Sequence, residues 1–214
     1  MHRLLLLALL PAVAVGESRD ISAYLLEPAE ERRLAATAAP PTVAGDASYY
    51  HLTPEGFTLT ETGSNGWHCF VERAFWVASS ADPGEFDPRI RAPHCINEAG
   101  ARSRMQEVFL EAKLAVAGLS RSEARAEVDA AHRDGRLKPP DGLAMTYMMS
   151  PEQWLGEQAG HWHPHLMFWV PYLENAEVGN NAPFGQLPFI DSSSGTRSSV
   201  LIVAVPPYDA AKTD

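Results

Sequence analysis

Cys69 and Cys95 place the strongest single constraint on how this chain can fold. They are its only two cysteines, so a disulfide, if one forms, can join only this pair. Such a bridge would close a loop of about 26 residues and hold both flanking segments together. The Cys-x-x-Cys spacing is absent, which argues against a thioredoxin-like motif. Because each cysteine follows a histidine, a metal site or a reactive thiol pair remains the alternative to a structural disulfide.

The N-terminal segment helps to decide between a structural disulfide and a metal site or reactive thiol pair. A positive start at residues 1–3 is followed by an apolar run over residues 4–15 that only Pro11 interrupts. Small residues before Glu17 match a cleavage site, and a run of about twelve residues is too short to span a bilayer. We therefore expect residues 1–16 to be a signal peptide, with a buried N-terminal helix as the alternative. Export to the periplasm or the cell exterior favours a Cys69–Cys95 disulfide, because these compartments are oxidising.

The charge balance excludes several classes of partner. The sequence has 17 Lys and Arg against 27 Asp and Glu, a net charge of −10. An acidic surface repels phosphate backbones and anionic lipids, so we expect no nucleic-acid partner. No second apolar run approaches the length of a membrane span, so we expect no membrane anchor after signal cleavage. A small ligand or a protein partner remains open. We interpret the scattered Arg121, Arg125, Arg133 and Arg136 as a solvated helix face.

Local patterning predicts an α+β fold, with an antiparallel sheet packed against two or three helices in one domain over residues 47–214. Residues 17–46 are expected to form a peripheral helical arm with one helix at 28–36. Strands at 47–52, 57–62 and 67–72 predict a β-meander, and 77–95 a loop. Further elements are expected as helices at 103–117 and 120–132, a short helix from Ser150, and strands at 143–149, 166–170 and 200–205. The adjacent Glu72 and Arg73 are interpreted as a surface ion pair, with a buried pair as the alternative.

The segment His161-Trp162-His163-Pro164-His165 is the chemically unusual part of the chain. It holds three of the eight histidines, and imidazole is the commonest metal ligand. In an extended segment the three share a face, but a spacing of ~7 Å lets only neighbouring pairs clamp one ion. Zinc or copper are the expected metals. Further ligands considered are Glu157, Glu174, His68, His94 and Met167. The alternative is that the histidines bond to backbone and pack beside Trp162.

Two hypotheses about function follow. The first is a binding or structural module without catalysis. The second is a metal-dependent, hydrolase-type enzyme in which Glu157 or Glu174 is the base and a metal-bound water the nucleophile. The Gly-x-Ser-x-Gly, His-Glu-x-x-His and phosphate-loop motifs are absent, and the segment 191–195 is interpreted as a polar turn. Whether the protein is an enzyme stays open at this level.

Four segments resemble a group of uncharacterised exported bacterial proteins. They are Ser64 to Arg73, Arg91 to Cys95, Met145 to Ser150 and Gly160 to Phe168. The resemblance covers roughly residues 30–205, and the His-Trp-His-Pro-His segment is its most specific part. It implies a bacterial source and export, and it transfers no activity or catalytic residues.

Overall fold

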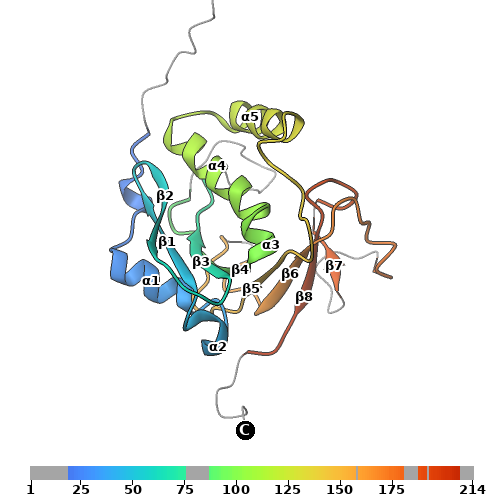
Figure 1. Cartoon of the computed structure of the whole chain (residues 1–214), viewed down its shortest axis with the longest axis horizontal. Helices are drawn as coiled ribbons and strands as arrows, with labels where there is room; N and C mark the ends of the chain where they lie inside the picture. Colours follow the sequence, from blue (N-terminus) through green and yellow to red (C-terminus); the bar gives the residue numbers. More distant parts are fainter. Residues whose placement is uncertain (1–18, 76–86, 158, 181–187, 192, 208–214) are drawn as a thin grey trace, which may run out of the picture.

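A single sheet forms the centre of the molecule (Figure 1). The structure, a computed structural model, describes residues 19–75, 87–157, 159–180, 188–191 and 193–207. Within these residues the sheet has eight strands in the order β2-β1-β3-β4-β5-β6-β8-β7. Helices accompany the sheet, so the expected α+β class is confirmed. The expected signal peptide at 1–16 lies outside the described residues.

The strands are short and mostly antiparallel. Their bounds are β1 Ser48–Thr53, β2 Gly56–Glu61, β3 Trp67–Glu72, β4 Ala92–Asn97, β5 Met145–Met148, β6 His165–Trp169, β7 Phe189–Ile190 and β8 Val200–Ala204. The first two strands form a hairpin whose tight turn uses Gly56 at φ 110°. β3 then pairs with the other edge of β1 in parallel, which a simple meander does not do. All other strand pairs are antiparallel.

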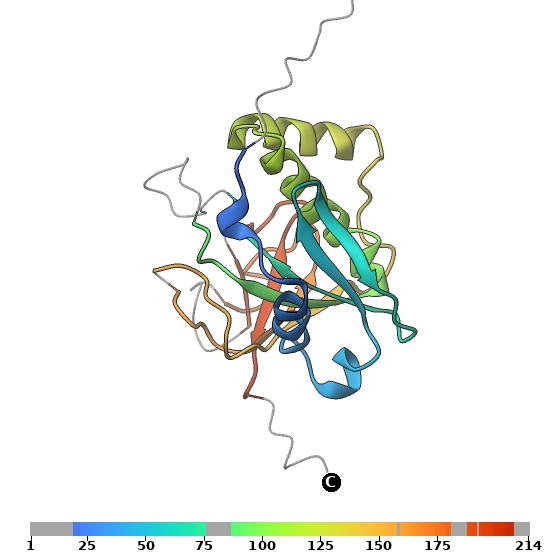
Figure 2. The same ribbon diagram turned by 90° about the vertical axis from the view of Figure 1, so that its left-hand side faces the viewer.

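Helices cover both faces of the sheet (Figure 2). Their bounds are α1 Pro28–Ala36, α2 Pro41–Ala44, α3 Glu98–Ala101, α4 Arg104–Val116 and α5 Arg121–Arg133, after a short 3-10 turn at Ser22–Tyr24. In both views α4 and α5 lie together on the side away from α1 and α2. α5 begins with the expected capping box, in which Ser120 and Glu123 satisfy each other's backbone N–H groups.

Each face of the sheet carries its own core. On the side of α4, Phe70 and Ile96 pack with Met105 and Val108 of that helix. On the side of α1, a second cluster joins Leu34, Ala35, Tyr49, Val71 and both cysteines. The expectation of a peripheral arm is therefore wrong for α1, because its alanine- and leucine-bearing face covers β1, β3 and β4.

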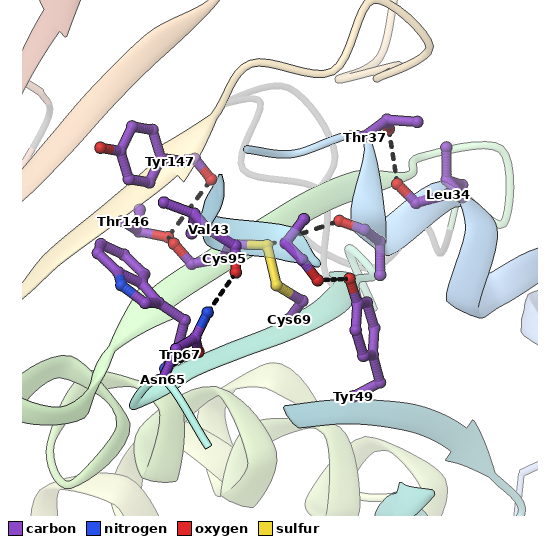
Figure 3. The surroundings of a disulfide bond; sticks show 12 residues. Leu34, Thr37, Val43, Tyr49, Asn65, Trp67, Cys69, Cys95, Thr146 and Tyr147 are labelled. Carbon is purple, nitrogen blue, oxygen red and sulfur yellow. Dashed lines mark hydrogen bonds between the residues drawn. A yellow bond between two sulfur atoms is a disulfide. The ribbon is translucent and has the colours of Figure 1, made fainter. Parts of the chain in front are cut away.

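The disulfide between Cys69 and Cys95 is confirmed (Figure 3). The two residues lie directly opposite each other on β3 and β4, with their Cα atoms 4.1 Å apart. Both are fully buried beneath α1. The loop expected over 77–95 is wrong at its end, where β4 begins at Ala92 and places Cys95 in the sheet. Residues 77–86 of that loop lie outside the described residues.

Arg73 is not a surface residue. Its side chain is fully buried, and Nη2 lies 3.0 Å from Oε1 of the equally buried Glu31 on α1. Glu72 points to the other face of the sheet, where its Oε2 lies 3.1 Å from Nε2 of His94. The expected surface pair is therefore wrong, because side chains alternate along β3 and send the two neighbours to opposite faces.

Two further expectations concern the second half of the chain. The short helix expected from Ser150 is wrong, since this segment forms a turn in which Ser150 Oγ accepts from the Glu152 N–H at 3.2 Å. The longest helices of the described part have 13 residues, and no helix there is long and apolar enough to cross a membrane.

Candidate functional site

The structure separates the three histidines of the predicted metal patch. His165 lies on β6 and is only 2% exposed. Its Nδ1 is 2.8 Å from the carbonyl oxygen of His163, and its ring meets Trp162 edge-on at 4.6 Å. Burial lowers the pKa of His165 to about 4, so its imidazole is neutral at physiological pH. This residue thus behaves as the alternative expects, bonded to backbone and packed beside the tryptophan.

His161 and His163 are exposed and line a common cavity of about 540 Å³. The other walls come from α1, α2 and the segment around Ser150, and His165 is not among the lining residues. Among the described residues, no group of three or more His, Cys, Asp or Glu side chains is placed to hold a metal ion. The structure therefore brings two of the three histidines to one cavity and leaves the third in the core.

The candidate carboxylate ligands lie elsewhere. Glu157 forms an ion pair with Arg89, with Oε1 and Nη1 2.8 Å apart. Glu174 lies in a turn that Glu177 stabilises by accepting its backbone N–H at 2.8 Å. Neither residue lines the cavity that holds His161 and His163. The other three considered ligands lie on the sheet, where His68 pairs with Glu98, His94 with Glu72, and Met167 packs against the core. Metal binding stays a prediction.

A different cavity, of about 720 Å³, is lined by two residues whose pKa is strongly shifted, Arg104 and Glu111. It lies between α4, α5 and the segment 191–200, and we call it the acid–arginine cavity. Its charged lining residues are Arg104, Glu107, Glu111, Arg121, Arg125, Asp191 and Arg197. A volume in this range is typical of small-molecule sites.

Arg104 lines the cavity from α4. We call the side of the cavity that is formed by Arg104, Glu107 and Glu111 of this helix its floor. Arg104 Nη1 lies 2.7 Å from Glu107 Oε1, and the second oxygen of Glu107 lies 2.9 Å from His132 Nε2. Burial acts to lower the pKa of Arg104, but four nearby carboxyl groups outweigh burial and raise it. These are Glu107, Glu111, Glu72 and Asp191. Glu107 pairs with Arg104 and His132, and Glu72 pairs with His94, whereas Glu111 and Asp191 form no ion pair among the described residues.

The pKa of Glu111 is strongly raised. Burial raises its pKa from 4.5 to about 7, and the neighbouring Glu107 and Glu72 add to the rise while Arg104 opposes it. A carboxyl group with this pKa exchanges protons readily near neutral pH. Ionisation of Glu111 in the folded protein lowers the free energy of unfolding. The pH dependence of stability therefore tests whether Glu111 is buried as described.

Stability should fall with pH because of Glu111. The folded pKa exceeds the unfolded value, so its contribution is fully present below pH 4.5 and is lost as pH rises to about 7. We expect a loss on the order of 2 kcal/mol over this interval, reduced by partial exposure. In urea unfolding at several pH values, Glu111→Gln should remove this slope, whereas Glu55→Gln at an exposed turn should keep it. An unchanged slope in Glu111→Gln would contradict the assignment.

The rim of the cavity is positively charged. Arg121 and Arg125 are exposed, one turn apart on α5, and form no ion pair among the described residues. Arg197 forms an ion pair with Asp129 of α5, which holds the segment 191–200 against that helix. Tyr172 on the rim has φ 66°, the only positive φ at a non-glycine position in the described part. Backbone strain of this kind clusters at functional sites.

The sequence contained a signal for this site that we interpreted differently. Arg104, Glu107 and Glu111 lie three and four residues apart, which places them on one helix face. Arg121 and Arg125 were interpreted as a solvated face, and Asp191 as part of a polar turn. Only the packing of α5 and the segment 191–200 against α4 brings these residues around one cavity.

Comparison with protein-family models, with curated proteins and with solved structures gives no match to this chain.

Proposed function

We propose that this is an exported binding module whose acid–arginine cavity takes a small zwitterionic ligand, such as an amino acid or a short peptide. The observation that carries the proposal is that two carboxyl groups of the lining, Glu111 and Asp191, form no ion pair within the part of the chain that the structure describes. Buried carboxyl groups are stabilised when a cation neutralises them. A ligand ammonium group next to Glu111 and Asp191 would supply that charge.

The arginines on the rim of the cavity would bind the carboxylate group of the ligand. Arg121 and Arg125 present two guanidinium groups on one face of α5, and guanidinium recognises carboxylate through paired hydrogen bonds. The cavity thus offers acid in its floor and base on its rim. A ligand that carries both signs of charge satisfies both parts at once, whereas a simple amine or a simple carboxylate satisfies one.

Export is supported by three observations. The first sixteen residues have the pattern of a signal peptide, and the resemblance of the four segments to exported bacterial proteins agrees with it. The buried Cys69–Cys95 disulfide is compatible with an oxidising compartment. Export is tested directly by fractionating cells and sequencing the N-terminus of the mature protein, which should begin at Glu17.

Ligand binding is expected to require both charges. Calorimetry with free amino acids and dipeptides should detect binding, while N-acetylated and amidated versions of the same compounds should bind at least tenfold more weakly. Arg125→Gln and Glu111→Gln should each weaken binding about tenfold, equal to about 1.4 kcal/mol. Arg136→Gln, which removes an exposed arginine outside the cavity, should bind as the wild type does. Equal binding of blocked and free compounds would contradict the proposal.

A second candidate function is metal binding at His161 and His163. The observation that favours it is their shared position on one cavity wall, which a two-histidine zinc or copper site needs. After challenge with zinc and copper, elemental analysis should find bound metal in the wild type and in His132→Gln, and less in His163→Ala. Absence of stoichiometric metal from the wild type would reject this candidate and the metal-dependent enzyme with it.

A further inference from the structure

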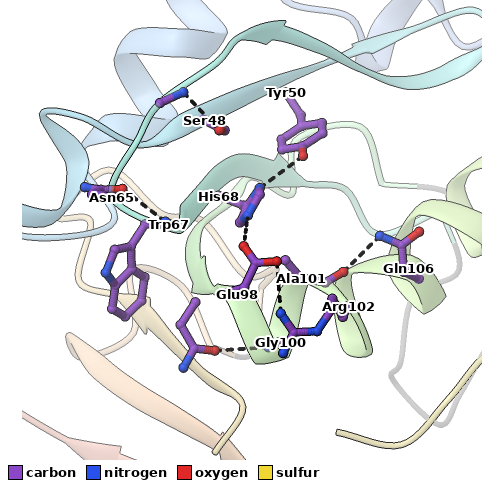
Figure 4. A network of polar contacts seen from close by, with 12 residues as sticks. Ser48, Tyr50, Asn65, Trp67, His68, Glu98, Gly100, Ala101, Arg102 and Gln106 are labelled. Atoms are coloured by element: carbon purple, nitrogen blue, oxygen red, sulfur yellow. Dashed lines mark hydrogen bonds and ion pairs between the residues drawn. The ribbon is translucent and has the colours of Figure 1, made fainter. Parts of the chain in front are cut away.

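A third cavity, of about 500 Å³, lies beside the N-terminal end of α4 (Figure 4). It is lined by Tyr50 of β1, His68 of β3 and Glu98 of α3, together with Arg102 and Lys138. None of its lining residues belongs to the acid–arginine cavity. Its chemistry is therefore independent of the ligand proposed above.

Tyr50, His68 and Glu98 form a continuous hydrogen-bonded chain. The hydroxyl oxygen of Tyr50 lies 3.0 Å from His68 Nδ1, and His68 Nε2 lies 3.1 Å from Glu98 Oε2. The pKa of Glu98 is lowered, chiefly by its hydrogen bond with His68, so Glu98 is a carboxylate that accepts. Nε2–H then donates to Glu98, which leaves Nδ1 as the acceptor for the Tyr50 hydroxyl proton. Figure 4 shows the imidazole between the phenol and the carboxylate.

The surrounding structure fixes this chain in place. Arg102 Nη1 donates to the other oxygen of Glu98 at 3.0 Å, and its Nη2 donates to Asp141 at 2.9 Å. The Tyr50 ring packs edge-on against Phe109, with centroids 5.1 Å apart. The β1–β2 ladder also shifts register between Tyr49 and Tyr50. Such irregularities are frequent next to active sites, where they redirect a side chain.

The order of groups is that of an acyl-transfer triad, with a phenol in the place of serine. The imidazole can take the hydroxyl proton, and the carboxylate stabilises the imidazolium that forms. Burial raises the pKa of Tyr50, so the phenol keeps its proton until the neighbouring base removes it. A base held at the hydroxyl is therefore what this tyrosine needs to act as a nucleophile.

We propose that Tyr50 is a nucleophile that accepts acyl groups from small activated carboxylic esters, with His68 as general base and Glu98 as a positioning residue. Tyr50 oxygen attacks the ester carbonyl while its proton passes to His68 Nδ1. The tetrahedral species collapses, the alkoxide leaves, and the proton on Nδ1 passes to it. The products are an acyl-tyrosine and an alcohol, and water attacking by the reverse steps restores Tyr50 and releases the acid.

The test uses p-nitrophenyl acetate as the probe. We expect a burst of one equivalent of nitrophenolate and one acetyl group, which peptide mapping by mass spectrometry should find on Tyr50. Tyr50→Phe keeps the ring packing and should abolish the burst. His68→Gln should slow acylation about 100-fold, the usual contribution of a general base.

Glu98→Gln separates a positioning role from a purely structural one. It should slow acylation by less than His68→Gln, because the imidazolium loses its carboxylate partner, and Glu98→Asp should restore part of the lost rate. Tyr147→Phe is the control for nonspecific reaction, since Tyr147 of β5 is partly exposed and lines neither this cavity nor the acid–arginine cavity. It should leave the burst intact.

The proposal is overturned by either of two results in variants with wild-type far-UV spectra and thermal midpoints. One is acetylation of Tyr147 at the same rate as Tyr50. The other is a His68→Gln protein that is acetylated as fast as the wild type. Neither result bears on the acid–arginine cavity, whose ligand is measured separately.

Discussion

Replacement of Arg73 by methionine is expected to lower the free energy of unfolding by roughly 3–5 kcal/mol. The reason is that Arg73 and Glu31 are both fully buried and form an ion pair at 3.0 Å. Removing the guanidinium leaves a carboxylate in the core without its main counter-charge. Burial already raises the pKa of Glu31 and lowers that of Arg73 to about 10, so each group depends on the other to stay charged.

The pair also connects distant parts of the chain. Arg73 Nε donates to the carbonyl oxygen of Tyr24 at 3.0 Å, and Nη1 donates to that of Val71. Glu31 accepts the backbone N–H of Leu52 at 3.3 Å. The N-terminal segment, α1, β1 and the end of β3 therefore share one buried network, and loss of Arg73 should loosen all of them.

Urea unfolding measures this effect. Arg89→Met is the matched control, because Arg89 is 62% exposed and its ion pairs with Asp87 and Glu157 should contribute less than about 1 kcal/mol. The double variant Arg73→Met with Glu31→Leu should recover much of the loss, since it removes the uncompensated charge. The interpretation fails if Arg73→Met is no less stable than Arg89→Met.

Loss of the Cys69–Cys95 disulfide should cost roughly 3 kcal/mol. The bridge has a sequence separation of 26, and opening it gives the unfolded chain more conformations. Because the two cysteines already face each other on paired strands, the reduced protein should keep its sheet but unfold at lower urea. A Cys69→Ala, Cys95→Ala double variant measures this loss without a reductant.

Two controls accompany this measurement. Reductant should lower the stability of the wild type to near that of the double variant and leave the double variant unchanged. Alkylation followed by mass measurement should find two thiols only in the reduced wild type. Two free thiols in the untreated wild type would show that the bridge does not form.

Much of the secondary structure was predictable because its signals are local. The helix expected at 28–36 is α1 itself, and the Ser120 capping box marks the start of α5. The alternation at 57–62 corresponds to β2 with a shift of one residue. Propensity, capping and periodicity each act within a few residues, so a sequence displays them directly.

The errors share a different cause. The turn signals Asp82-Pro83-Gly84 and Asp87-Pro88 predict a loop that runs through Cys95, yet strands on both sides hold β4 in the sheet. Arg73 was placed at the surface because Glu31 lies 42 positions earlier in the sequence. A charged residue is assigned to the surface unless its partner is known, and the partner is known only after α1 packs on β3.

The candidate sites also depend partly on local sequence signals and partly on tertiary contacts. The sequence by itself determined which two cysteines can pair, most of the elements and the residue types: three histidines in one segment, and an arginine with two glutamates on one helix face. Tertiary structure decided which of them meet, separating His165 from His161 and His163 and closing α4, α5 and the segment 191–200 around Arg104. Side-chain chemistry is local, but proximity depends on strand register and helix packing across the whole chain.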